Sequence, residues 1–125
     1  MIRGLGCDVC AVSRIQKAME NPRFLERWFT AYERGYIAAR KNGAQTAAGI
    51  FAAKEAFVKA LGTGFDALMP DQVGVCHDQS GAPVYDINDR MRDAMEKRFA
   101  KAAYLSISHD GDTAFAVCVL EGENP

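Results

Sequence analysis

The stretch that decides the fold reads Ile50-Phe51-Ala52-Ala53-Lys54-Glu55-Ala56-Phe57-Val58-Lys59-Ala60-Leu61-Gly62-Thr63-Gly64. Alanine, leucine, lysine and glutamate favour helix, and no proline interrupts them. Gly62 is well placed to end this helix in a left-handed conformation. At about 100° per residue, one side of the helix is apolar and is expected to be buried; it carries Ile50, Ala53, Phe57 and Leu61.

Glu55 and Lys59 lie one turn apart on the opposite side of this helix, and Lys54 lies at the edge of the apolar stripe. The pair has two interpretations. It is either a surface ion pair, worth about 0.2–0.5 kcal/mol, or part of a site for a metal and a phosphate beside the glycine loop. The helix alone favours the surface pair, because such pairs are frequent on surface helices.

The whole chain has 125 residues, a length that fits one domain spanning residues 1–125. Its net charge of −1 argues against nucleic acid as a partner, so any anion-binding surface must be local. No apolar run approaches the roughly 20 residues that span a membrane. The N-terminus lacks the apolar region of a signal peptide. We therefore expect a cytoplasmic protein with no membrane partner.

The remaining sequence alternates between strand-like and helix-like segments. Strands are predicted over residues 2–9, 73–77, 83–87, 104–109 and 113–120, and helices over 12–19, 23–29, 31–41, 44–61 and 89–101. Gly4 and Gly6 in the first strand indicate a close backbone approach or a bulge. This order predicts an α+β fold, in which a small antiparallel or mixed sheet packs on the long central helix.

The four cysteines are Cys7, Cys10, Cys76 and Cys118. Cys7 and Cys10 have the spacing of a redox or zinc pair, but a structural zinc site needs a second ligand pair at similar spacing. We therefore interpret all four as small buried hydrophobic residues.

Several side chains could form a metal and phosphate site. Asp8 ends the first strand, where its carboxylate could hold a metal or cap the next helix. Asp8 and Glu55 together suit Mg²⁺, which prefers one or two carboxylates with waters and phosphate oxygens. Lys54 and Lys59 flank Glu55, and the loop Gly62-Thr63-Gly64 offers backbone N–H groups to an anion. His109, at a strand end, could reach a phosphate or ribose, although a structural histidine is commoner.

Two further features have a structural and a functional interpretation. Thr30 and Glu33 have the spacing of a capping box, which we rank above a catalytic role for Glu33. The segment with Arg14, Arg23 and Arg27 is locally basic. It is either a docking face for an acidic partner or a solvated surface, which is the commoner case.

Four motifs carry a resemblance that covers nearly the whole chain. They are Gly4-x-Gly6-x-Asp8 with Arg14-Ile15, Arg23-Phe24-x-x-Arg27-x-x-Thr30-x-x-Glu33, Phe51-Ala52-Ala53-Lys54-Glu55-Ala56-x-x-Lys59-Ala60-x-Gly62-Thr63-Gly64, and Ser106-Ile107-Ser108-His109. In this order they resemble the holo-acyl-carrier-protein synthases, the short bacterial class of 4′-phosphopantetheinyl transferases.

The resemblance implies a Mg²⁺-dependent transfer of phosphopantetheine from coenzyme A to a serine of apo acyl carrier protein, in fatty acid biosynthesis, with release of adenosine 3′,5′-bisphosphate. It implies a homotrimer with active sites at the subunit interfaces. It also implies residue roles: Asp8 and Glu55 as metal ligands that act with Lys59 in catalysis; Lys54, Lys59, Gly62, Thr63, Gly64, Pro83 and His109 as coenzyme A contacts; and Arg14, Arg23, Phe24 and Arg27 as the carrier-docking face.

Two positions depart from the family pattern. Ile50 stands where family members usually carry an arginine, and Ala82 stands where they usually carry a basic residue. Nearby positive charges that could compensate are Arg3, Arg40 and Lys41.

The alternatives to the transferase are a coenzyme A- or carrier-binding module with reduced turnover, a transferase serving a polyketide-type carrier, and a structural α+β protein. The general base stays open among Glu55, Glu33, Asp8 and a metal-bound water.

Overall fold

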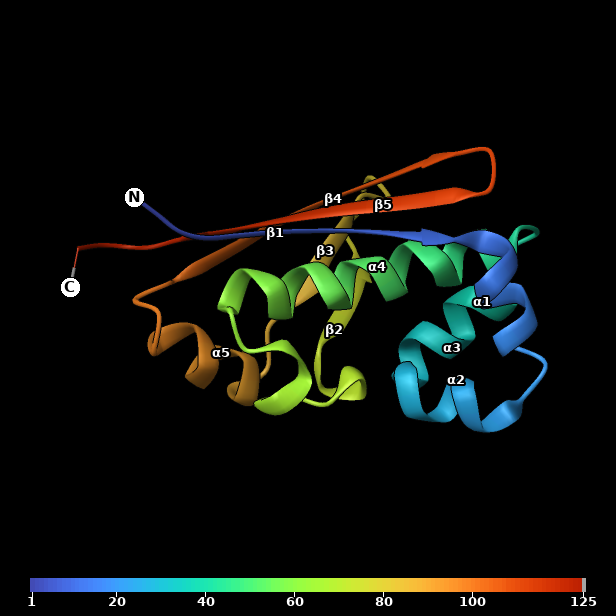
Figure 1. Cartoon of the computed structure of the whole chain (residues 1–125), viewed down its shortest axis with the longest axis horizontal. Coiled ribbons are helices and arrows are strands. Elements are labelled where there is room, and N and C mark those ends of the chain that lie inside the picture. Colours follow the sequence, from blue (N-terminus) through green and yellow to red (C-terminus); the bar gives the residue numbers. More distant parts are fainter. Residues whose placement is uncertain (125) are drawn as a thin grey trace.

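A three-stranded antiparallel sheet lies along the long helix α4 (Gly43–Leu61) in the computed structural model, which describes residues 1–124 (Figure 1). The strand order is β1 (Ile2–Ala11), β5 (Thr113–Glu121) and β4 (Ala102–Asp110), so β1 and β4 are the two edges. All pairs within this sheet are antiparallel. The hairpin β2 (Gly74–His77) and β3 (Pro83–Asp86) forms a separate two-stranded sheet. The predicted α+β fold is therefore confirmed.

The other helices gather at the two ends of α4 (Figure 1). Near its first half lie α1 (Val12–Ala18), α2 (Pro22–Trp28) and α3 (Ala31–Ala38), and near its end lies α5 (Asp89–Glu96). Two short 3₁₀ turns, η1 (Gly64–Asp66) and η2 (Pro70–Gln72), follow α4. The prediction for α5 was too long at its C-terminal end. The N–H groups of Arg98 and Ala100 both donate to the Met95 carbonyl, and Phe99 adopts a positive φ of 59°, which ends the helix.

Helix α4 is buried on more than the predicted stripe. The sheet covers one side and α3 and the β2–β3 hairpin cover others, so the run from Ala47 to Lys54 has no exposed residue. Glu55 is half-buried and Lys59 is exposed. Gly62 ends the helix with a φ of 78°, which confirms the predicted left-handed cap. Between residues 1 and 124, no helix combines the length and the apolar character needed to cross a membrane.

The glycines of β1 allow this strand to lie directly on α4. A Cβ atom at Gly6 would collide with the Ala56 carbonyl oxygen and would lie 2.6 Å from the Ala60 nitrogen. A Cβ atom at Gly4 would collide with the Ala60 carbonyl oxygen. The predicted close approach is therefore confirmed, and it explains why the strand can bring Asp8 to the helix.

We expect the substitution Gly6→Ala to destabilise the protein by more than about 3 kcal/mol, because strand and helix backbones must separate. The matched control is Gly35→Ala on α3, where an added Cβ meets nothing within 4 Å. That substitution should stabilise the protein by about 0.5–1 kcal/mol, since alanine favours helix. Urea unfolding of both variants measures the difference. Equal stabilities for the two variants would contradict this account of β1.

The prediction that all four cysteines are buried was correct for Cys10 and Cys118 and wrong for Cys7, which is exposed; Cys76 is half-buried. Side chains alternate across a strand, so Cys7 and Cys10 lie on opposite faces of β1. Cys10 donates to the Ala48 carbonyl at 3.3 Å, inside the core. The two thiols therefore do not form a chelating pair.

Candidate active site

Asp8 and Lys59 join the first strand to the long helix. The Lys59 amine lies 2.9 Å from Asp8 Oδ1 and donates to the Cys7 carbonyl at 3.2 Å. The hydrogen bond to Asp8 raises the pKa of Lys59, against the opposing effect of desolvation. No ion pair joins Glu55 to Lys59 within the described residues. The surface-pair interpretation was therefore wrong, because Lys59 turns toward β1 instead.

Glu55 is the least compensated carboxylate of this cluster. Burial first, and the neighbouring Asp8 carboxylate second, raise the pKa of Glu55, while Lys59 and Arg14 lower it. In residues 1–124, no hydrogen bond or ion pair engages the Glu55 side chain. Two neighbouring carboxylates, of which only Asp8 pairs with a lysine, are an arrangement that a cation stabilises.

The donor set fits Mg²⁺. No group of three or more histidine, cysteine, aspartate or glutamate side chains is placed to hold a metal within residues 1–124. Mg²⁺ needs no such group, since it usually keeps several waters and takes one or two carboxylates plus phosphate oxygens. Asp8 and Glu55 supply two carboxylates, and the exposed amine of Lys59 lies beside them.

Lys54 lies in the core and not at the phosphate site that the sequence indicated. Its side chain is fully buried, and its amine lies 2.7 Å from Glu33 Oε1, 2.8 Å from the Pro70 carbonyl and 2.7 Å from the Val73 carbonyl. Burial lowers the pKa of Lys54, and Glu33 opposes this effect. Three acceptors at these distances engage all three donors of an ammonium group. No donor remains for a phosphate, so the predicted coenzyme A contact is corrected to a structural role.

Glu33 anchors this buried pair to two other elements. Its Oε1 accepts from the Thr30 N–H at 2.8 Å, and the Thr30 hydroxyl accepts from the Glu33 N–H, so the predicted capping box is confirmed. Its Oε2 accepts from the Val75 N–H of β2 at 2.7 Å. Each carboxylate oxygen is engaged inside the core, which removes Glu33 from the candidate general bases.

The glycine loop after α4 offers fewer donors than the sequence indicated. The N–H of Gly62 donates to the carbonyls of Val58 and Lys59, and the N–H of Thr63 donates to Val58. These bonds close the C-terminal end of the helix, where orphan carbonyls need donors. Gly64 keeps a positive φ of 60° and makes no backbone bond of this kind in the described part of the chain. The predicted contact of the loop N–H groups with an anion is therefore corrected for Gly62 and Thr63, and it stays a prediction for Gly64.

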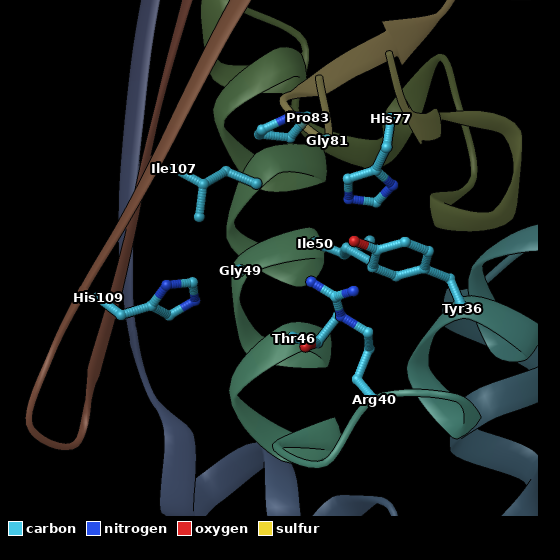
Figure 2. Close-up of a pocket in the computed structure, with 10 residues that line it drawn as sticks. All are labelled: Tyr36, Arg40, Thr46, Gly49, Ile50, His77, Gly81, Pro83, Ile107 and His109. Atoms are coloured by element: carbon cyan, nitrogen blue, oxygen red, sulfur yellow. The ribbon is translucent and has the colours of Figure 1, made fainter. Parts of the chain in front are cut away.

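A second group of polar side chains surrounds a pocket of about 170 Å³ between α3, α4, β4 and the β2–β3 hairpin (Figure 2). The predicted contacts Pro83 and His109 both line it, and His109 Nε2 lies 3.0 Å from the Gln45 carbonyl. Its other lining residues are Tyr36, Arg40, Thr46, Gly49, Ile50, His77, Gly81 and Ile107. A complete small-molecule site is usually about 300–1,000 Å³, so this pocket fits only part of a ligand.

The two groups lie at opposite edges of the three-stranded sheet. Asp8 is on β1 and His109 is on β4, with β5 between them. Neighbouring strands are about 4.8 Å apart, so the two edge strands are about 10 Å apart. The contacts to Lys59 and to the Gln45 carbonyl also place the two side chains against different parts of α4. The Asp8 group and the His109 pocket, named the two half-sites below, are therefore separate on one chain.

The predicted docking residues border an aromatic cluster. Phe24 packs against Trp28, Phe29 and Phe51, with ring centroids 5.8–6.3 Å apart. The Arg14 guanidinium lies 5.6 Å from the centre of the Phe51 ring. Arg14, Arg23 and Arg27 are exposed. Of these three arginines, Arg14 therefore lies beside the cluster, and its charge lowers the pKa of Glu55.

Sequence reasoning missed Tyr36 and His77. Their rings stack 3.8 Å apart at an angle of 8°, and the Tyr32 hydroxyl lies 3.1 Å from His77 Nδ1. No local motif predicts this contact, because it joins α3 to the end of β2. Pro83 was predicted beside a glycine turn, and that hairpin turn was the available signal that His77 would face the same pocket.

The chain matches a known family and many of its members. Residues 4–118 match the family model of the 4′-phosphopantetheinyl transferase superfamily. Holo-[acyl-carrier-protein] synthase of Treponema denticola is 37% identical over 123 residues, which cover 98% of this chain and 100% of the relative. The synthase of Trichlorobacter lovleyi is 41% identical over 124 residues, which cover 97% and 98% of the two chains.

Solved structures of such synthases have the same fold. The Neisseria meningitidis synthase superposes with a TM-score of 0.89 at 31% identity, covering 97% of this chain and 99% of that chain. The Bacillus anthracis synthase, solved in complex with coenzyme A (3′,5′-ADP), superposes with a TM-score of 0.83 at 33% identity, covering 98% and 99%. These similarities cover both half-sites.

Proposed function

Because the chain belongs to the 4′-phosphopantetheinyl transferase superfamily, we propose that it transfers 4′-phosphopantetheine from coenzyme A to a serine of apo acyl carrier protein. The reaction needs Mg²⁺ and releases adenosine 3′,5′-bisphosphate. The observation that carries this proposal is the cluster of Asp8, Glu55 and Lys59, in which the exposed lysine pairs with Asp8 and the neighbouring Glu55 carboxylate has no such partner. Such a cluster suits a metal and a diphosphate together.

The contacts of these residues support the following proposed roles. Asp8 and Glu55 would hold Mg²⁺, which when bound offsets charge on the leaving bisphosphate. The Lys59 side chain is 51% exposed, so its amine can contact the diphosphate while it holds Asp8 in place. Gly64 at the end of the loop and the half-site with Pro83 and His109 contact the remainder of coenzyme A. Most of the rate comes from position and electrostatics, as in other phosphoryl transfers.

The carrier serine must lose a proton, and the contacts of Glu33 count against it as the acceptor. Glu33 is engaged in the core. Glu55, with its raised pKa, Asp8 and a water remain as acceptors. The exposed Arg14, Arg23 and Arg27 with Phe24 form the docking face, and an acidic carrier surface complements their charge.

The active enzyme is a homotrimer in this proposal. Its half-sites lie at opposite sheet edges, so a cyclic arrangement joins the β1 edge of one copy to the β4 edge of the next. The outer face of the sheet, turned away from α4, is apolar and exposed; it includes Leu5 at 66%, Val9 at 62%, Tyr104 at 54% and Phe115 at 38% exposure. An apolar patch of this kind usually marks a protein interface.

The direct test mixes the protein with coenzyme A, Mg²⁺ and an apo acyl carrier protein, and then weighs the carrier. We expect a gain of one phosphopantetheine group at the serine and no gain when Mg²⁺ is removed by a chelator. We propose the carrier of fatty acid synthesis as the acceptor, and a polyketide-type carrier is the alternative acceptor in the same assay. Binding of coenzyme A without a mass gain on any carrier would favour the binding module.

A further inference from the structure

Trp28, the only tryptophan of the chain, connects α2 to the segment that follows the glycine loop. It is the last residue of α2, and the centre of its ring lies 5.3 Å from that of Phe65, with the two ring planes at 88°. The same ring lies 4.4 Å from that of Phe51 on α4. Phe65 belongs to η1 and directly follows Gly64. One half-buried indole therefore contacts α4 and the end of the loop together.

The backbone around Gly64 has few other restraints. The bonds from the Gly62 and Thr63 N–H groups fix only the start of the loop on α4. Gly64 is exposed, and a Cβ atom there would meet nothing within 4 Å. Within residues 1–124, no hydrogen bond joins residues 65–68 to another helix or strand. Segments with so few contacts open locally at a low free energy.

Two apolar side chains anchor this segment to the core. Leu68 is 2% exposed and holds the far end of the segment. Phe65 is half-buried and is the anchor next to Gly64. In the part of the chain that the structure describes, its ring pairs with Trp28 and with no other aromatic ring. The position of the Gly64 backbone therefore depends on the contact between Phe65 and Trp28.

Trp28 is the fixed partner in this contact. Its ring packs on Phe51 and lies 6.2 Å from the ring of Phe24. The next residue, Phe29, is fully buried and holds the end of α2 in the core. Because Trp28 has several such partners and Phe65 has one ring partner, the indole holds the loop and not the reverse.

We propose that Trp28 is a positioning residue that holds Phe65, and through it Gly64, in the conformation that contacts coenzyme A. This inference rests on the proposed function, which assigns that contact to Gly64. Trp28 itself does not touch the ligand; its effect passes through the aromatic pair.

The test measures the dissociation constant of coenzyme A by calorimetry, with the full chain, Mg²⁺ and no carrier protein. We expect Trp28→Leu to weaken binding about 3–10-fold, the value of one aromatic pair. Trp28→Phe should keep binding within about twofold of the wild type, because it retains a ring. Leu25→Ala is the matched control, since it removes packing from the same helix without removing a ring. It should lower the thermal midpoint and leave the dissociation constant within about twofold.

A double-mutant cycle assigns the effect to the contact itself. Phe65→Leu should weaken coenzyme A binding to the same extent as Trp28→Leu. The double variant should bind no more weakly than either single variant, because all three lack the same contact. Additive losses would show that Trp28 does not act through Phe65 and would overturn the inference.

The fluorescence of the single tryptophan tests the same contact in solution. Phe65→Leu should shift the Trp28 emission to longer wavelength, because the indole gains contact with water, and Leu25→Ala should not. Unshifted emission in Phe65→Leu would contradict the contact. A Trp28→Leu protein that binds coenzyme A as tightly as the wild type would overturn the inference even if the carrier is modified normally. A wild-type protein that binds no coenzyme A would overturn the proposed function as well.

Discussion

Glu55→Gln is expected to lower kcat for carrier modification by about 10²–10³-fold, because it removes one of the two carboxylates proposed to hold Mg²⁺. The folded protein should not lose stability. Burial and the Asp8 carboxylate raise the pKa of Glu55, so its charge is unfavourable in the fold without a metal. The neutral amide removes that repulsion. Activity against Mg²⁺ concentration, together with the thermal midpoint, separates a site defect from a folding defect.

The matched control for this prediction is Glu96→Gln, which removes a carboxylate from the exposed end of α5. It should keep the full rate. Asp8→Asn should behave like Glu55→Gln, with a loss of only about 0–1 kcal/mol of stability, since the Lys59 side chain of its ion pair is 51% exposed. A Glu55→Gln enzyme that works at a near-normal rate would show that the metal assignment is wrong.

Lys54→Met is expected to have the largest effect on stability, a loss of about 3–5 kcal/mol. The substitution leaves the Glu33 carboxylate charged and buried with only backbone N–H partners, and it leaves the Pro70 and Val73 carbonyls without their donor. These carbonyls and Glu33 connect α3, η2 and β2 to α4. The substitution therefore weakens the contacts of three elements with α4. Chemical denaturation measures the free energy of unfolding.

Lys59→Met supplies the comparison for Lys54→Met within the same helix. The Lys59 side chain is 51% exposed, and its pair with Asp8 is worth about 0–1 kcal/mol. We therefore expect a small loss of stability and a large loss of activity for Lys59→Met. If the two lysine variants unfolded at the same denaturant concentration, the buried pair would not have the structural role described above.

Local sequence patterns predicted the elements well, because the signals that start and stop them act within a few residues. The Thr30 and Glu33 capping box, the Gly62 cap and the tight approach at Gly6 were each predicted from spacing or residue type alone. The end of α5 was missed because the positive φ at Phe99 has no local signal in a non-glycine residue.

The contacts between residues far apart in the sequence could not be predicted from residue spacing. Periodicity placed Lys54 at the edge of the apolar stripe, and only the packing of α3, η2 and β2 around α4 shows that its amine is enclosed. In the same way, Lys59 had two possible acidic partners in the sequence. Because β1 lies close to α4, Lys59 pairs with Asp8 and not with Glu55. The half-site with Tyr36 and His77 depends on a hairpin that meets α3, which periodicity cannot detect.

We propose that one active site is assembled from the β1 edge of one copy and the β4 edge of another. The direct measurement mixes two inactive variants, Asp8→Ala and His109→Ala, refolds them together and assays carrier modification at limiting coenzyme A. In a cyclic trimer with random mixing, about one quarter of the interfaces combine an intact Asp8 with an intact His109. We predict about a quarter of the wild-type rate from the co-refolded mixture and almost none from either variant alone. A co-refolded mixture as inactive as its components would contradict a site shared between subunits.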